Sequence, residues 1–307
     1  MMEMPIEKQI ENAVQTLRAG DLVVFPTETV YGLGADATNA NAIAKIFALK
    51  NRPSFNPLIV HVASRSMAEE LVEFNSVADR LAEKFWAGAL TLVLPKKKNC
   101  PIPAIASAGL DTLAIRVPAH PIAHKLLTKF GKPIVAPSAN ISGKISPTEY
   151  SHISFKNIPI LHGEKCEIGL ESTVIDATCE LPTILRHGFI TEEEVIKTVG
   201  ELGVVGGKIK SPGMMQKHYS PTLPVRLNIT EPKADEAFLA FGNNSYCDAK
   251  YVLNLSPSGD LIEAAANLFS MLHELDKPTD FSAIAVMPIP DVGIGKAIND
   301  RLMRASV

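Results

Sequence analysis

Short apolar runs alternate with segments of helical period along the first two-thirds of the chain. The runs that we expect to form strands lie at residues 22–25, 58–62, 90–94, 113–117, 134–136 and 173–176. Between them, apolar side chains recur with helical spacing at residues 42–49, 77–85 and 121–130, and Thr191 followed by three glutamates starts a further helix. This alternation predicts a domain of the α/β (α+β) class built around a sheet.

The pattern changes between Gly203 and Pro224, where glycine, proline and serine are frequent and apolar periodicity is absent. Such a stretch is either a linker or a functional loop. Beyond it, strand-like runs at 238–241, 251–255 and 284–287 alternate with helices at 261–275 and 298–303. We therefore divide the chain into a first domain at 1–204, an interdomain segment at 205–223 and a smaller α/β domain at 224–307.

Composition narrows the class of protein. The 307 residues are 46% hydrophobic and 21% charged, which suits folded domains with ample cores and not a disordered chain. A net charge of −3 gives no general attraction to nucleic acid, although a local basic patch stays open. The four cysteines lie far apart without a C-x-x-C pair, which disfavours a zinc ribbon or a disulfide framework. With no basic, apolar leader and no apolar run near ~20 residues, we expect a cytoplasmic protein without a membrane partner.

The most informative polar stretch is residues 26–34, which follows the first strand-like run and reads as a loop built for contact. Its proline, threonines, glutamate and glycines supply short polar groups and a backbone that can approach a ligand closely. It is not a dinucleotide fingerprint, because its glycines come too late after the strand and lack the G-x-G-x-x-G spacing.

Further polar groups stand at helix and strand ends. Lys50, Arg52 and Asn56 can hold an anion, or they can simply be favourable at a helix C-terminus. Arg116 suits a carboxylate or a phosphate, although an arginine at a strand end is commonplace, and His61 in an apolar strand is more often a satisfied core residue.

Small hydroxyls and amides crowd residues 136–143, where they can meet phosphate or sugar oxygens or form an ordinary turn. Ser172 and Arg186 repeat the arrangement of a strand end with a polar group. Together these positions predict one cleft lined by several loops. Competing motifs fail: the pair of His120 and His124 lacks the glutamate and the third ligand of a zinc helix, and no P-loop or G-x-S-x-G elbow occurs.

Several unusual short motifs follow one another along the chain. They are residues 26–34, Lys50-x-Arg52-Pro53, Asn56-Pro57-Leu58-x-Val60-His61, residues 136–143, Ser146-Pro147-Thr148, Ser211-Pro212-Gly213-Met214 and His218-Tyr219-Ser220-Pro221. In these motifs the sequence resembles the two-domain YrdC/Sua5 family of threonylcarbamoyl-AMP synthases over nearly its whole length. It departs from the family where Trp86-Ala87-Gly88-Ala89 replaces tryptophan-proline-glycine-proline, a change that costs two φ restraints and no chemical group.

The resemblance implies a YrdC-like twisted mixed sheet with a concave cleft, followed by a smaller Rossmann-like domain. It implies a nucleotidyltransferase that converts L-threonine, bicarbonate and ATP into threonylcarbamoyl-adenylate and pyrophosphate for N6-threonylcarbamoyladenosine at position 37 of tRNA. Mg²⁺ is expected on the ATP phosphates with no protein ligand named. The expected partners are the downstream tRNA threonylcarbamoyl-transferase complex and, weakly, RNA.

The family motifs also imply a role for individual residues. On the threonine side they place Thr29, His61, Arg116, Ser172 and the backbone of Ala136. On the ATP side they place Lys50, Arg52, Asn56, Thr112, Ser138, Asn140, Ser146, Arg186 and Tyr219, with Lys50 and Arg52 the catalytic cations. The interdomain segment would act as a lid with Tyr219 over the nucleotide, and Glu28 would be structural.

Two other functions stay open on the sequence. The first domain could be an RNA-binding module, which salt-dependent tRNA affinity without ATP–pyrophosphate exchange would reveal. Hydrogenase-maturation carbamoyltransferases carry a related domain, but the absence of paired C-x-x-C spacing disfavours that class.

Overall fold

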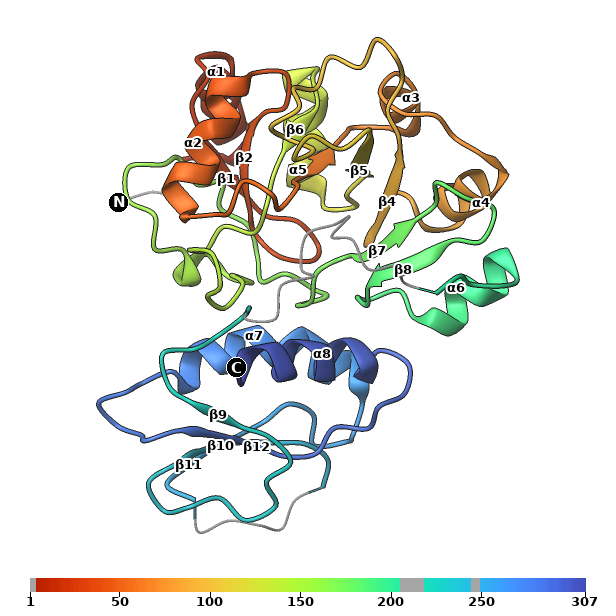
Figure 1. The fold of residues 1–307 in the computed structure, drawn as a ribbon. Helices are drawn as coiled ribbons and strands as arrows, with labels where there is room; N and C mark the ends of the chain where they lie inside the picture. The colour runs from red at the N-terminus through yellow and green to blue at the C-terminus, as the bar shows by residue number, and fades with distance from the viewer. Residues whose placement is uncertain (1–3, 205–217, 244–248) are drawn as a thin grey trace.

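Two sheets organise the chain in the computed structural model, which describes residues 4–204, 218–243 and 249–307 (Figure 1). The larger sheet has eight strands in the order β1-β2-β6-β3-β5-β4-β7-β8, and the smaller has four in the order β11-β10-β12-β9. The pairs β3/β5 and β4/β7 are parallel, whereas the other neighbours in the larger sheet are antiparallel. The predicted mixed α/β fold with a second sheet is therefore confirmed.

The first sheet carries helices on both faces. Its strands are β1 (Val23–Phe25), β2 (Gly32–Asp36), β3 (Ile59–His61), β4 (Leu90–Pro95), β5 (Thr112–Arg116), β6 (Ile134–Val135), β7 (Thr173–Asp176) and β8 (Thr183–Arg186). The helices of this part are α1 (Ile6–Arg18), α2 (Ala40–Lys50), α3 (Arg65–Glu69), α4 (Ser76–Phe85), α5 (Pro121–Phe130) and α6 (Glu192–Val199), with a 3₁₀ turn at Tyr150–His152. Side chains alternate along β1, so Val23 and Phe25 join the core beneath α1 and α5, whereas Val24 joins the core beneath α2 and α4.

Strand β2 corrects the prediction that residues 26–34 are a loop throughout, because the loop ends at Tyr31 and Gly32–Asp36 pair with β1 and β6. The stretch lacks the β-branched side chains that signal a strand. The glycines have a packing reason: a Cβ on Gly34 would lie 2.8 Å from Phe25 Cε1 and 2.9 Å from Ile134 Cγ2. Helices α1 and α3 and strand β9 were also not predicted.

The second domain is a parallel α/β unit, as expected of a Rossmann-like fold. Its strands are β9 (Val225–Arg226), β10 (Ala237–Ala240), β11 (Tyr251–Asn254) and β12 (Ile284–Val286), and each neighbouring pair is parallel. Helices α7 (Leu261–Leu275) and α8 (Gly295–Ala305) lie on the side of this sheet that faces the first domain (Figure 1). Asp260 caps α7 through the backbone N–H groups of Ile262 and Glu263, which fixes where that helix begins.

Loops of the first domain rest on these two helices. Val30, Ile145 and Leu170 belong to the same apolar cluster as the buried faces of α7 and α8. Gly169 takes a φ of +69°, and a Cβ there would lie 2.5 Å from the carbonyl oxygen of Ala266. The domains therefore meet through close backbone contact as well as through side chains.

A pair of stacked imidazoles crosses the same boundary. The rings of His152 and His273 lie 4.0 Å apart between centroids, at an angle of 18°. His273 Nε2 also lies 3.3 Å from the carbonyl oxygen of Ser146. Burial is the main cause that lowers the pKa of each imidazole to about 4, so both rings are neutral at pH 7.

Candidate active site

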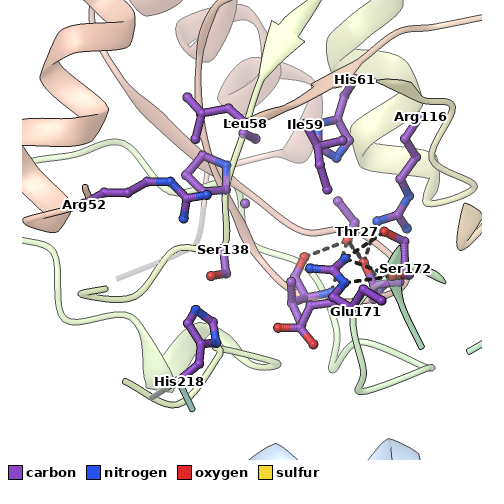
Figure 2. A pocket seen from close by; sticks show the side chains of 16 residues that line it. Thr27, Arg52, Leu58, Ile59, His61, Arg116, Ser138, Glu171, Ser172 and His218 are labelled. Carbon is purple, nitrogen blue, oxygen red and sulfur yellow. Dashed lines mark hydrogen bonds between the residues drawn. The ribbon is translucent and has the colours of Figure 1, made fainter. Parts of the chain in front are cut away.

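One pocket gathers most of the polar groups that the sequence analysis singled out (Figure 2). Its lining comprises Thr27, Thr29, Val30, Gly32, Arg52, Leu58, Ile59, His61, Arg116, Ala136, Pro137, Ser138, Glu171, Ser172, Arg186 and His218. Eight of the predicted site residues are among them: Thr29, Arg52, His61, Arg116, Ala136, Ser138, Ser172 and Arg186. They come from the loop before β2, the helix–strand junction before β3, the end of β5 and the segments around β6, β7 and β8.

Arg116, the last residue of β5, is buried and held by three acceptors. Its Nε donates to the carbonyl of Gly88 at 3.0 Å, Nη1 donates to Thr29 Oγ1 at 2.9 Å, and Nη2 pairs with Glu28 Oε1 at 2.6 Å. A guanidinium has five N–H donors, so two N–H groups are left for a ligand. Burial raises the pKa of Glu28, but Arg116 and backbone hydrogen bonds together lower it below its ordinary value, which keeps this acid as the counter-ion of the arginine.

His61 lies in the pocket wall with its ring edge-on to Phe25. Burial, followed by the positive charge of Arg116, lowers the pKa of His61 to about 3. The imidazole is therefore neutral across the physiological pH range and can offer one N–H and one lone pair, not a positive charge.

Arg52 and Arg186 supply positive charge. Arg52 donates through Nε to the carbonyl of Asn56 at 3.2 Å and through Nη2 to that of Pro57 at 2.9 Å. Arg186 donates from Nε and Nη2 to the carbonyl of Ser172, at 3.1 and 2.8 Å. Burial, followed by the charge of Arg186, lowers the pKa of Arg52 to about 10, which still leaves it positive at neutral pH. A buried arginine and a half-buried one, both held by neutral carbonyls, favour a multiply charged anion.

Lys50 is placed differently from the prediction, because it does not line the pocket. Its Nζ donates to the carbonyls of Ser138, at 2.7 Å, and Asn140. Burial lowers its pKa well below the ordinary range. Lys50 thus ties the end of α2 to the loop that presents Ser138 to the pocket.

Five other predicted residues also lie outside the lining: Asn56, Thr112, Asn140, Ser146 and Tyr219. Asn140 donates to the carbonyls of Ile141 and Lys144, and Thr112 begins β5 opposite Pro95 of β4. Buried Asn56 accepts from Arg52 through its carbonyl, which joins it to the pocket wall. Whether these residues contact a substrate stays a prediction.

Tyr219 is buried against the second domain. Its ring stacks on Phe269 of α7 at 5.4 Å between centroids, and the guanidinium of Arg301 lies 5.3 Å above it. Of the interdomain segment at 205–223, which is the expected lid, residues 205–217 lie outside the described residues.

Eight lining residues were not predicted as site residues, and three of these have polar side chains: Thr27, Glu171 and His218. Thr27 Oγ1 shares a hydrogen bond of 2.8 Å with Thr29 Oγ1 and donates to the carbonyl of Val30. Each lies beside a residue that the motifs did single out, so adjacency in sequence was the signal available. Glu171 lies directly before Ser172, and His218 directly before Tyr219.

The carboxylates near the pocket are engaged by protein groups. Glu171 Oε1 accepts from Ser146 Oγ at 3.0 Å, and Oε2 pairs with Arg301 Nε at 3.0 Å. Within the described ranges, no group of three or more His, Cys, Asp or Glu side chains could hold a metal ion. Cys100, Cys166 and Cys179 are free thiols, and Cys247 lies outside the described residues.

Comparison with known families matches both halves of the chain. Residues 15–188 match the Sua5/YciO/YrdC family model, described as telomere recombination. Residues 190–307 match the model described as the C-terminal domain of threonylcarbamoyl-AMP synthase. In the described part of the chain, no helix is both long enough and apolar enough to cross a membrane.

Similar proteins share nearly the full length. The chain is 42% identical to threonylcarbamoyl-AMP synthase of Pyrococcus abyssi, covering 98% of this chain and 94% of that one. It is 39% identical to threonylcarbamoyl-AMP synthase of Bacillus subtilis, covering 98% and 93%. Among solved structures, P. abyssi Sua5 complexed with L-threonine superposes with a TM-score of 0.88 at 40% identity, covering 99% of this chain and 96% of that one.

Proposed function

The chain belongs to the Sua5/YciO/YrdC family and carries the C-terminal domain of its Sua5 members, and on that premise we propose the reaction of this pocket. It is an L-threonylcarbamoyladenylate synthase, a nucleotidyltransferase that uses L-threonine, bicarbonate and ATP. The curated relatives that share this name support the activity over 98% of the chain.

One observation supports the proposal most directly: a single pocket holds a carboxylate-binding group and a phosphate-binding group on opposite sides. Figure 2 shows His61, Arg116 and Ser172 on one side and Arg52 and Ser138 on the other. We assign the first side to threonine, whose carboxylate would accept the two remaining N–H groups of Arg116. We assign the second side to the triphosphate.

The chemistry asks for positioning and charge, not for a protein nucleophile. The amine of threonine takes up the carbon of bicarbonate with loss of water, and an oxygen of the resulting carbamate attacks the α-phosphate and displaces pyrophosphate. Neutral His61 and the hydroxyls of Thr29 and Ser172 can orient the amine and the carbamate through hydrogen bonds, without adding a charge of their own. Arg52 and Arg186 neutralise the charge that develops on the phosphates.

Mg²⁺ fits this pocket as a companion of ATP. Glu28 and Glu171, the acids nearest the lining, are already held by Arg116 and Arg301, so the ion would be held through phosphate oxygens and water. The residues that hold those phosphates, Arg52, Ser138 and Arg186, would then fix its place. When bound, Mg²⁺ supplies further neutralisation of the phosphate charge.

The product is a reactive mixed anhydride that a further enzyme must consume. We propose that it passes to the complex that transfers threonylcarbamoyl to tRNA, with at most weak direct binding of RNA by this chain. The location of that tRNA chemistry makes the cytoplasm the expected site of action.

The decisive test is formation of the adenylate. Purified protein incubated with ATP, Mg²⁺, threonine and labelled bicarbonate should yield a labelled adenylate and release pyrophosphate. Omission of threonine is the control and should abolish both signals. No labelled product under varied conditions, together with salt-dependent binding of tRNA, would replace this proposal with an RNA-binding function.

A further inference from the structure

Helix α8 of the second domain places one arginine against Glu171, a residue of the pocket lining. Arg301 has no exposed surface, and its Nε pairs with Glu171 Oε2 at 3.0 Å while Nη1 pairs with Asp300 Oδ2 at 2.8 Å. Glu171 lines the pocket, so this ion pair joins the second domain directly to the site. A fully buried arginine needs such partners because its desolvation is costly.

Glu171 in turn connects the pocket lining to Ser146, which lies outside that lining. Its Oε1 accepts from Ser146 Oγ at 3.0 Å, and the next residue, Ser172, binds Arg186 through its carbonyl. The backbone leaves little freedom here, because a Cβ on Gly188 would lie 2.5 Å from the carbonyl oxygen of Glu171. If the Glu171 carboxylate moved, the hydrogen bond from Ser146 would therefore change first.

The same helix also fixes the segment that carries His218. The guanidinium of Arg301 lies 5.3 Å above the Tyr219 ring, a cation–π contact. The backbone N–H of His218 donates to the carbonyl of Arg304 at 3.3 Å. Arg301 Nη2 has no hydrogen-bond partner among the described residues. The charge of the guanidinium is therefore stabilised by Glu171, Asp300 and this ring.

We propose that Arg301 is a positioning residue of the pocket, which acts through Glu171 on Ser146 and, through Tyr219, on His218. This inference rests on the proposed function, because it concerns the binding of ATP in that reaction. The second domain is then a structural part of the nucleotide site.

Loss of Arg301 would change the charge state of Glu171. The charged and titratable groups that act on this carboxylate are Arg301 from α8, Arg186 from β8 and His218 from the interdomain segment. Although burial opposes ionisation, Arg301 followed by Arg186 lowers the pKa of Glu171 to about 2. Without Arg301 the buried carboxylate keeps its desolvation and loses its strongest partner, so its pKa rises.

The test compares Arg301→Met, Glu171→Gln and the double variant, with kcat and KM for ATP and for threonine measured from pH 5 to pH 8. For Arg301→Met we expect KM for ATP to rise about 10- to 100-fold, with a smaller change in KM for threonine. Its activity should also gain an acidic limb that the wild type lacks. The double variant, which has no carboxylate to protonate, should lack that limb and recover part of the ATP affinity.

Lys296→Met is the matched control, because Lys296 lies on the same helix and makes an interdomain ion pair with Glu192 at 2.8 Å outside the pocket lining. It should leave the kinetics unchanged. If Arg301→Met fails to fold, Arg301→Lys carries the test, and a raised KM for ATP at an unchanged unfolding midpoint is expected.

Two results would overturn the inference: a folded Arg301 variant with wild-type KM and pH profile, or a double variant no better for ATP than Arg301→Met. A wild-type protein that forms no adenylate would instead overturn the proposed function.

Discussion

Arg116 is the side chain of the pocket that we propose binds the carboxylate of the substrate. Three of its N–H groups are used inside the protein, by Gly88, Thr29 and Glu28, and these contacts fix the plane of the guanidinium. A ligand carboxylate therefore meets a group whose orientation is set before binding, which lowers the entropy cost of association. In the absence of a ligand, the positive charge of Arg116 is balanced by the negative charge of Glu28, so the pair has no net charge.

Replacement of Arg116 should therefore weaken the binding of threonine and leave the binding of ATP unchanged. We expect Arg116→Ala to raise KM for threonine by about 100-fold or more, because a bidentate charged contact of about 1.5–3 kcal/mol is lost and Glu28 is left without its partner. Threonine-dependent ATP–pyrophosphate exchange measures the effect.

Arg116→Lys should restore little of this loss, since an ammonium lacks the planar fork. Exposed Arg18 at the end of α1 offers the control substitution Arg18→Ala, which should leave exchange unchanged. Wild-type exchange in Arg116→Ala would show that the carboxylate binds elsewhere.

At this scale the sequence predicted which residues line the pocket better than it predicted their contacts. Polar side chains at strand ends indicated one shared cleft, because strand ends in α/β proteins meet at one edge. The family motifs then assigned Thr29, His61, Arg116 and Ser172 to it. The sequence could not show that Lys50 turns to the carbonyls of Ser138 and Asn140. Which acceptor a long side chain reaches depends on the placement of segments some 90 residues away, and local pattern carries no information about it.

Strand β2 determines how closely the sheet packs at the site. Its two glycines bring the backbone over the Phe25 ring and beside Ala136, where a Cβ on Gly32 would lie 3.3 Å from Ala136 Cβ. The loop that carries Thr27 and Thr29 is thereby held against the pocket wall. The small residues of β2 leave the space that its backbone needs to lie this close to Phe25 and Ala136.

Gly34→Ala tests this packing. The new methyl group would overlap Phe25 and Ile134, both fully buried, so we expect a loss of about 1–3 kcal/mol in the free energy of unfolding. Phe25→Leu removes the ring atoms in question and should itself destabilise the protein by opening a cavity. Chemical denaturation of the two single variants and the double variant measures the coupling, which should make the double variant more stable than the sum predicts. Simple additivity would mean that the ring is not the obstacle.

Element boundaries followed the strength of their local signals. The helix at Pro121–Phe130 has a first-turn proline, a C-cap glycine at Gly131 and a clear apolar face, and its predicted bounds are confirmed. Thr191 caps α6 with the expected reciprocal bond to Glu194. Strand β2 was misread because Gly-Leu-Gly-Ala resembles a loop in composition. Its glycines are explained by the side chains packed against them, those of Phe25, Ile134 and Ala136.

The interface between domains gives the molecule a dependence on pH. The neutral imidazoles of His152 and His273 have pKa values lowered to about 4, mainly by burial. Lys165 lowers that of His152 further, and His152 lowers that of His273 further. Because an unfolded histidine titrates near 6.5, the unfolded state binds more protons between about pH 6.5 and pH 4. Their contribution to stability is therefore complete above about pH 6.5 and is lost as the pH falls toward 4.

His273→Phe keeps a ring in the stack and removes one of these protonations. Between pH 7 and pH 5 the wild type should lose at least about 2–4 °C more of its unfolding midpoint than this variant, the shift expected for about 1 kcal/mol. Differential scanning calorimetry at the two pH values measures the difference. His124→Gln, at an exposed site on α5, is the control and should follow the wild type. Equal losses in wild type and His273→Phe would exclude the stacked pair as the cause.

The sequence predicted two domains from the change in texture near residue 203, but it gave no hint of how they dock. Arg301 reads as one more charged residue on an amphipathic helix, yet it has no exposed surface. Its burial follows from the meeting of α8 with the segment before β7, which is a contact between surfaces and not a property of either helix or strand alone.

That contact also has a consequence in time. Glu171 and Arg301 are separated by 130 positions in the chain. At a synthesis rate of about 5–20 residues per second, a ribosome needs on the order of 10 s to travel from one to the other. During that interval the nascent first domain can form its sheet but holds a carboxylate whose partner does not yet exist. The ion pair between Glu171 and Arg301 therefore forms only after α8 has been synthesised, so a chain that stops before α8 lacks it.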